Sequence, residues 1–206
     1  LYQDAKTGTY YVYYINGLND SRPSYRYWNH ISGAVSADGV HFSKIGPVID
    51  VPSPEIAWLG SGSTWPLKNA STGEPSDPPT FVLQYSGALP INETWSGHVG
   101  YQRIYFATSH DLISWTPYDK PFDIDTRYYN RTIPQKRWDC MSLVCKNPSK
   151  SLHHCTSGYY AAFTATPYGD LENGFGLAQS SDGLHWEALP PITQCTKDSR
   201  WPDAPC

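Results

Sequence analysis

One seven-residue pattern occurs three times in this chain and divides it into units of similar length. It consists of a serine, any residue, an aspartate, a glycine or leucine, two further residues and an aromatic. The copies are residues 36–42, 109–115 and 180–186. They recur about every 70 residues, and a repeat of nearly constant length is typical of propeller and solenoid folds. Since Asp-Gly favours a tight turn between antiparallel strands, each unit is predicted to hold four short strands, as one blade of a β-propeller does.

The three repeated aspartates are interpreted as turn residues and not as catalytic groups. They are Asp38, Asp111 and Asp182. An aspartate side chain accepts hydrogen bonds from the amides that follow it, which is what a tight turn needs. Their recurrence in every unit is therefore explained by the backbone alone.

The composition favours strands over helices throughout the 206 residues. Tyr (16) and Trp (8) suit a pleated sheet, while Gly (16) and Pro (18) interrupt helices and form turns. No helical period of 3.6 residues persists over a useful length. We therefore predict an all-β chain. The predicted blade units are, approximately, residues 1–52, 53–126 and 127–194, with the start of a further blade at 195–206.

Three blades do not close a propeller, because such rings contain roughly four to eight blades. An open ring also leaves the edges of its strands exposed. We therefore expect either that the chain is part of a longer protein, which is the interpretation we favour, or that another chain completes the ring.

Charge and hydropathy argue against nucleic-acid binding and against a membrane span. The formal net charge is −4 and the basic residues form no cluster, so no nucleic-acid partner is expected. No run of 18 or more apolar residues occurs in the sequence. The first residues lack the charged and apolar regions of a signal peptide, so the sequence is interpreted as starting at a mature or truncated end.

Glycosylation sequons and clustered cysteines indicate a secreted protein in an oxidising compartment. The asparagines of the sequons are Asn69, Asn92 and Asn130. All five cysteines lie in the C-terminal third of the chain, and none forms a C-x-x-C pair, which argues against a zinc site. No metal or other cofactor is expected.

The spacing of the cysteines predicts two disulfides. We expect Cys145 to pair with Cys155 across a short hairpin, and Cys195 to pair with Cys206. Cys140 is then the odd cysteine. It predicts a partner outside these 206 residues, through self-assembly or a covalent bond to another chain.

Several motifs, in order along the chain, resemble those of the five-bladed β-propeller glycosidases. The resemblance is closest to the family 32 glycoside hydrolases (invertases, inulinases and levanases), with families 43 and 68 as relatives. Residues 28–42 resemble the W-G-H-A-x-S-x-D-L-x-H-W segment of that family, and residues 58–63 resemble its F-S-G-S motif. Residues 83–87 resemble its Y-T-G strand, and residues 137–140 its R-D-P motif. The resemblance implies a five-bladed β-propeller of which this chain covers about three blades.

The resemblance implies a role in the reaction for Asp139. In such enzymes one carboxylate acts as nucleophile or base and another as acid on the two sides of the glycosidic bond. The aspartate of R-D-P binds sugar hydroxyls and stabilises the transition state. Asp139 takes this third position, with Trp138 inserted before it and Cys140 in place of the proline. A structural aspartate at the start of a strand is the alternative. The nucleophile is expected before Leu1, outside the chain, and the acid is expected either beyond Cys206 or to be absent.

The same motifs supply candidates for substrate binding. Arg137 is expected to pair with Asp139 or with a sugar carboxylate, a solvated arginine at a strand edge being the alternative. Ser61 and Ser63 are expected to face the central pocket or to form a tight turn at the start of a blade. Trp58 and Trp65 are candidates for stacking on a sugar ring, although packing between blades is the commoner role of a propeller tryptophan.

These observations predict a secreted glycoside hydrolase-like propeller that acts on a fructoside or a related glycoside, with carbohydrate as its partner. The alternative is a non-catalytic extracellular glycoprotein that binds glycans or serves in an assembly. The altered R-D-P motif, the additional cysteines and the missing catalytic pair favour this alternative.

Overall fold

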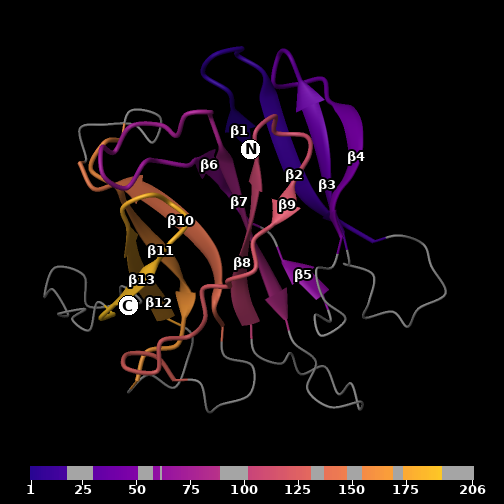
Figure 1. Ribbon diagram of the computed structural model, residues 1–206. Coiled ribbons are helices and arrows are strands. Elements are labelled where there is room, and N and C mark those ends of the chain that lie inside the picture. Colours follow the sequence, from indigo (N-terminus) through magenta and orange to yellow (C-terminus); the bar gives the residue numbers. More distant parts are fainter. Residues whose placement is uncertain are drawn as a thin grey trace, which may run out of the picture.

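The chain folds into antiparallel sheets that follow one another in sequence order (Figure 1). The computed structural model describes residues 1–17, 30–50, 58–60, 62–88, 102–130, 137–147, 155–168 and 174–191. Within these ranges three sheets are present. No helix in the described part has the length and apolar character that crossing a bilayer requires.

The first and third sheets each have four strands, in the order of the sequence. The first comprises β1 (Tyr2–Gln3), β2 (Tyr10–Asn16), β3 (His30–Ser36) and β4 (Ser43–Asp50). The third comprises β10 (Asp139–Cys145), β11 (Tyr159–Ala165), β12 (Gly174–Ser180) and β13 (Glu187–Leu189).

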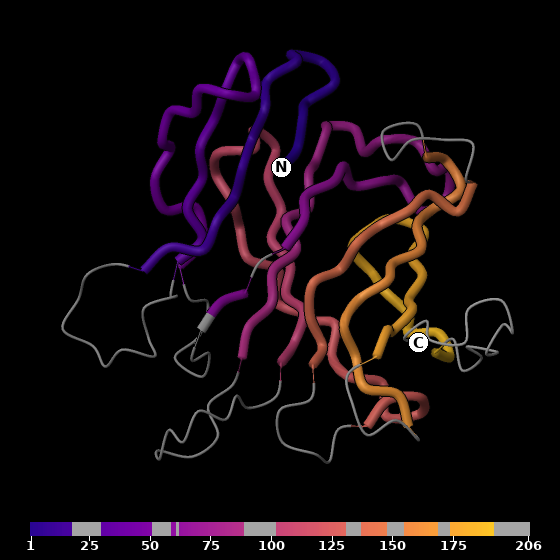
Figure 2. The backbone as a smooth tube through the Cα atoms, turned by 180° about the vertical axis from the view of Figure 1, so that it is seen from behind, coloured from indigo at the N-terminus to yellow at the C-terminus, as the bar shows by residue number. Residues whose placement is uncertain are grey.

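In the second sheet, two short strands share the position that one strand takes in the other sheets. Its strands are β5 (Trp58–Gly60), β6 (Thr64–Pro66), β7 (Phe81–Ala88), β8 (Gln102–Ser109) and β9 (Thr116–Pro117). Both β5 and β6 pair with β7, which pairs with β8 and then β9. Each sheet is therefore a blade whose strands succeed one another, and the second sheet lies between the first and the third (Figure 2).

The repeated pattern forms the turn between the third and fourth strands of each blade. In every copy the serine hydroxyl accepts a hydrogen bond from the amide of the fourth residue, at 2.9 Å for Gly39, 2.9 Å for Leu112 and 2.8 Å for Gly183. This fourth residue has a positive φ in all three turns, which glycine adopts readily and leucine rarely. The prediction that the aspartates serve the turn is confirmed, because each accepts hydrogen bonds from the amides two and three residues further along.

Aromatic side chains join consecutive blades at these same turns. The Tyr13 hydroxyl of the first blade donates to the carbonyl oxygen of Leu112 at 2.7 Å. The indole Nε1 of Trp65, in the second blade, donates to the carbonyl oxygen of Gly183 at 2.9 Å. One core cluster fills each of the two junctions between blades. The blades are therefore held by apolar packing, together with an aromatic donor to the left-handed residue of the following turn.

The predicted Cys145–Cys155 disulfide is confirmed, and it ties the end of β10 to the segment before β11. The other predicted disulfide, Cys195–Cys206, lies outside the described residues. The expectation of an all-β chain that covers three blades of a propeller is also confirmed. The exact boundaries of the blade units stay predictions.

Candidate functional site

Asp139 lies at the start of β10, the first strand of the third blade, where that strand meets the second blade. It is buried, with 3% of its surface exposed. The Ser86 hydroxyl, on β7 of the second blade, donates a hydrogen bond to one carboxylate oxygen. The Arg137 guanidinium donates to the other at 2.6 Å. Both oxygens of the candidate carboxylate are therefore held by side chains of this chain.

Arg137 links the buried carboxylate to the surface. Its side chain is 41% exposed, whereas that of Asp139 is 5% exposed. The expectation that Arg137 pairs with Asp139 therefore agrees with the structure, and part of the guanidinium still faces solvent. A ligand at this position would meet the arginine before the aspartate.

A β-bulge directs the Asp139 side chain toward the second blade. The register between β10 and β11 shifts between Asp139 and Ser142, and Cys140 has a φ of 54°. A bulge adds one residue to a strand, changes where a side chain points, and is frequent beside active sites. The residues that distinguish this segment from an R-D-P motif, Trp138 and Cys140, are thus part of an irregular strand start.

Three buried polar side chains of the second blade hold the start of β10 from the opposite side. The oxygen of Gln102 accepts from the Trp138 amide at 3.3 Å, and that of Gln84 accepts from the Met141 amide at 3.3 Å. The Ser86 hydroxyl accepts from the Cys140 amide at 3.4 Å. The backbone that carries Asp139 is therefore fixed by side chains from β7 and β8.

These three residues were not among the predicted site residues. Gln84, Ser86 and Gln102 are 0%, 0% and 3% exposed. Two of them could have been found in the sequence, because Gln84 and Ser86 are polar residues within the otherwise apolar run of residues 81–88. Polar side chains that are buried in such a strand almost always have hydrogen-bond partners.

The predicted substrate-binding residues have different positions in the structure. The hydroxyl of Ser63, which is partly buried, donates to the Met141 carbonyl oxygen at 2.6 Å and so connects the second blade to β10. Trp58 begins β5, but its side chain is not described, and Ser61 lies outside the described residues.

The prediction that Trp65 stacks on a sugar is wrong. Its side chain is 1% exposed, and its ring packs against those of Phe106 and Trp186 with centroids 6.4 Å and 6.1 Å away. Because neither face of the indole is open, Trp65 serves the packing between blades, the alternative that the sequence had left open.

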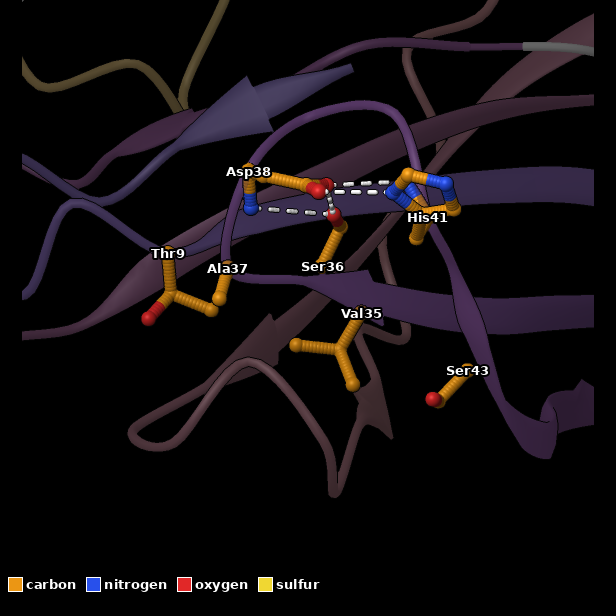
Figure 3. A pocket seen from close by; sticks show the side chains of 7 residues that line it. All are labelled: Thr9, Val35, Ser36, Ala37, Asp38, His41 and Ser43. Atoms are coloured by element: carbon orange, nitrogen blue, oxygen red, sulfur yellow. Dashed lines mark hydrogen bonds and ion pairs between the residues drawn. The ribbon is translucent and has the colours of Figure 1, made fainter.

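A separate hollow of about 430 Å³ lies at the turn of the first blade (Figure 3). Its lining includes Thr9, Asp38 and His41, but neither Asp139 nor Arg137. The Asp38 carboxylate there is occupied by the turn, since it accepts from the Val40 amide at 2.9 Å and from the His41 amide at 2.8 Å. This hollow is therefore a feature of the turn and is not continuous with the candidate site.

The arrangement around Asp139 is suited to binding and positioning a polar ligand. A carboxylate can accept about four hydrogen bonds on its two oxygens. Each oxygen of Asp139 accepts one in the described contacts, which leaves capacity to accept from a ligand. Among the residues that the structure describes, no group of three or more His, Cys, Asp or Glu side chains is placed to hold a metal ion.

Comparison with known proteins defines the class of the fold. A family 32 β-fructofuranosidase from Bombyx mori, determined in complex with sucrose, superposes with a TM-score of 0.58 at 14% identity, covering 96% of this chain and 34% of that one. An exo-β-1,3-galactanase from Clostridium thermocellum superposes with a TM-score of 0.52 at 18% identity, covering 88% of this chain and 34% of that one. The chain has the fold of the propeller glycoside hydrolases, which confirms the resemblance at the level of fold.

The chain spans about a third of the length of these solved structures. No protein-family model matches its sequence, and no curated protein matches it either.

Proposed function

We propose that this chain is part of an extracellular glycoside hydrolase in which Asp139 contacts the hydroxyls of the bound sugar and stabilises the transition state. The observation that carries the proposal is the position of Asp139 at the start of the first strand of the third blade, fixed by Arg137 and Ser86. A carboxylate held rigidly in this way can accept hydrogen bonds from sugar hydroxyls without reorganising during the reaction.

In this proposal the nucleophile and the acid come from parts of the protein outside residues 1–206. Glycoside hydrolysis needs a pair of carboxylates on opposite sides of the bond. Asp139 would act beside that pair and would not replace either member, because both of its oxygens already accept hydrogen bonds within the chain. We propose a fructoside or a related glycoside as substrate, in line with the two kinds of enzyme that share the fold.

A non-catalytic glycan-binding or assembly role is the second candidate, and one observation favours it. Asp139 is only 3% exposed, and its Arg137 partner stands between it and solvent. A buried carboxylate of this kind can stabilise the junction between blades without taking part in any reaction. In this case Arg137 would be the main contact for a glycan.

The location outside the cell is also a proposal, supported by covalent features of the chain. The Cys145–Cys155 disulfide is of the kind that persists in oxidising compartments. Asn69 lies in an exposed loop, where its side-chain oxygen accepts from the Ser71 amide at 2.9 Å, and Asn130 is partly buried. We propose glycans at Asn69, Asn92 and Asn130, of which Asn92 lies outside the described residues.

The test is turnover of a panel of fructosides and galactosides by the secreted native protein and its Asp139→Asn variant. Losing one preorganised contact to the transition state typically lowers kcat about 10²–10³-fold, and we expect a loss of this size. Asp119→Asn, in an exposed loop, is the matched control and should leave kcat unchanged. A native protein that binds these sugars without cleaving any of them would support the second candidate and overturn the first.

A further inference from the structure

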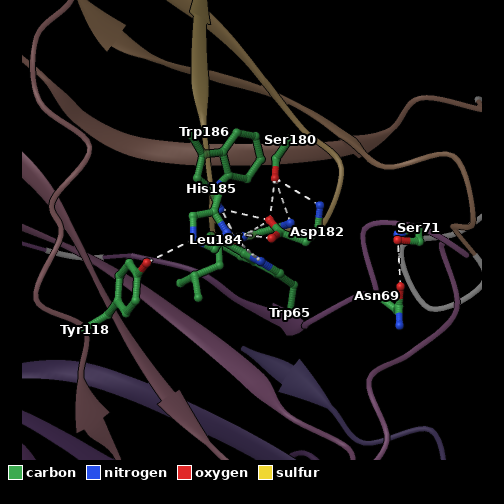
Figure 4. A network of polar contacts seen from close by, with 10 residues as sticks. Trp65, Asn69, Ser71, Tyr118, Ser180, Asp182, Leu184, His185 and Trp186 are labelled. Carbon is green, nitrogen blue, oxygen red and sulfur yellow. Dashed lines mark hydrogen bonds and ion pairs between the residues drawn. The ribbon is translucent and has the colours of Figure 1, made fainter.

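A hydrogen-bonded chain of three side chains lies at the outer junction of the second and third blades (Figure 4). An oxygen of Asp182 lies 2.6 Å from Nδ1 of His185, and Nε2 of the same imidazole lies 3.0 Å from the hydroxyl of Tyr118. Tyr118 follows β9 of the second blade, whereas Asp182 and His185 belong to the turn of the third. The junction therefore brings a phenol, an imidazole and a carboxylate into line.

The turn fixes the carboxylate, and the carboxylate favours the tautomer of the neutral imidazole that carries its proton on Nδ1. Asp182 Oδ1 accepts from the amides of Leu184 at 2.8 Å and His185 at 2.9 Å. Burial opposes ionisation of this carboxyl, but the hydrogen bonds from His185 and Leu184 outweigh burial and lower its pKa. A charged carboxylate accepts the Nδ1 proton, so the neutral ring presents its Nε2 lone pair, to which the Tyr118 hydroxyl donates.

The other copies of the turn show that Tyr118 is not needed to form it. In the first copy Asp38 and His41 make the same contact at 2.7 Å, and His41 has no tyrosine among its described contacts. In the second copy Ser114 occupies the position of the histidine, and the turn still forms. The first turn forms without a tyrosine at this position, and the second turn forms without a histidine. The contact of Tyr118 with His185 is therefore not required for the turn to form.

A nucleophile that is hydrogen-bonded to a base, with the base oriented by a third group, is the arrangement that activates weak nucleophiles in proteins. We propose that Tyr118, His185 and Asp182 form such a triad and that the Tyr118 oxygen accepts an acyl group from activated esters. The His185 side chain is 65% exposed and Tyr118 is partly buried, so an ester can approach the hydroxyl from solvent.

The reaction is a simple acyl transfer. The Tyr118 oxygen attacks the carbonyl carbon of the ester while its proton passes to Nε2 of His185. The bond between the carbonyl carbon and the leaving oxygen then breaks, and His185 returns the proton to the departing group. The products are O-acyl-Tyr118 and the free alcohol or phenol, and no oxidant, reductant or metal takes part.

The experiment treats the protein with 4-nitrophenyl acetate, follows nitrophenolate release, and locates the acetyl group by peptide mass spectrometry. Tyr168 is the internal reference, because it is 52% exposed and its hydroxyl makes no hydrogen bond with the described residues. Base assistance by a positioned histidine is worth about 10²-fold or more. We expect Tyr118 to be acetylated about 10²-fold faster than Tyr168, with one equivalent of nitrophenolate released rapidly.

Three variants separate the triad from a merely exposed phenol. His185→Gln should reduce the rate at Tyr118 to that at Tyr168, whereas His41→Gln, which alters the equivalent pair in the first turn, should leave it unchanged. Tyr118→Phe should remove the rapid release. Equal rates at Tyr118 and Tyr168 would overturn the proposal, as would a His185→Gln variant that reacts like the unsubstituted protein.

Discussion

Ser86 and Asp139 lie on different blades, and the hydroxyl of Ser86 donates a hydrogen bond to the carboxylate of Asp139 across their junction. The same serine oxygen accepts from the Cys140 amide at 3.4 Å. One side chain of the second blade thus fixes both the carboxylate and the bulged backbone that carries it. The candidate site therefore depends on how two blades meet and not on one motif.

Replacing Ser86 with alanine should destabilise the protein, because a buried carboxylate loses one of its hydrogen-bond donors. Leaving such a group unsatisfied costs about 1–3 kcal/mol. We expect urea denaturation of Ser86→Ala to show a free energy of unfolding lower by this amount. Ser43→Ala, which removes an exposed hydroxyl, is the control. Identical unfolding of the two variants would show that the Ser86–Asp139 contact contributes nothing.

Trp65→Phe should affect stability and not sugar binding. The substitution removes the donor to the Gly183 carbonyl oxygen and part of a fully buried ring. A loss of about 1–3 kcal/mol in the free energy of unfolding is expected. Affinity for a glycoside, measured by calorimetry below the unfolding transition, should not change. A weakened affinity with an unchanged free energy of unfolding would show instead that Trp65 contacts the sugar.

The turn glycines provide a matched pair of substitutions. A Cβ on Gly183, where φ is 91°, would lie 2.6 Å from Nε1 of Trp65, whereas one on Gly39, where φ is 77°, would meet the Tyr10 ring at 3.3 Å. Gly183→Ala and Gly39→Ala each place an alanine in the left-handed backbone conformation, which costs about 1–2 kcal/mol. Only Gly183→Ala also displaces an aromatic of the adjoining blade, so its thermal midpoint should fall further. Equal thermal midpoints for the two variants would show that the Trp65 ring can move away from position 183 at little cost in stability.

The turn of the second blade should weaken in acid. Backbone hydrogen bonds, that of the Ser114 amide first, lower the pKa of Asp111 to about 2 despite slight burial. A carboxyl whose folded pKa is depressed stabilises the folded state above its unfolded pKa, and this contribution is lost as the pH falls toward 2. Asp111→Asn should therefore unfold more easily than the native chain at pH 7, with the difference shrinking between about pH 4 and 2. A difference independent of pH would show that the charge is irrelevant.

The repeat made much of the fold predictable. The turn pattern depends on local hydrogen bonds, so the positions of Asp38, Asp111 and Asp182 indicated where each blade reverses. Cys145 and Cys155 were close enough in sequence for their pairing to be inferred. These features are determined within a few residues of chain.

The candidate site was less predictable, because its geometry comes from contacts between blades. Nothing local to Cys140 shows that the strand is bulged there, since a bulge is defined by the register with β11. The burial of Trp65 depends on the third blade, whose Gly183 lies 118 residues further along the chain. Gln84 and Ser86 gain their roles only when β10 packs against β7.

The most direct test of the central claim is the affinity of the protein for glycosides with and without the Asp139 carboxylate. Calorimetric titration with sucrose and with a β-1,3-galacto-oligosaccharide would compare the native protein, Asp139→Asn and Asp119→Asn, with circular dichroism to verify the fold. The account predicts that one of these sugars binds the native protein and the Asp119→Asn variant equally. It also predicts that Asp139→Asn binds that sugar at least about tenfold more weakly, since a hydrogen bond to a charged group is worth about 1.5–3 kcal/mol. An Asp139→Asn variant that folds and binds as tightly as the native protein would contradict it.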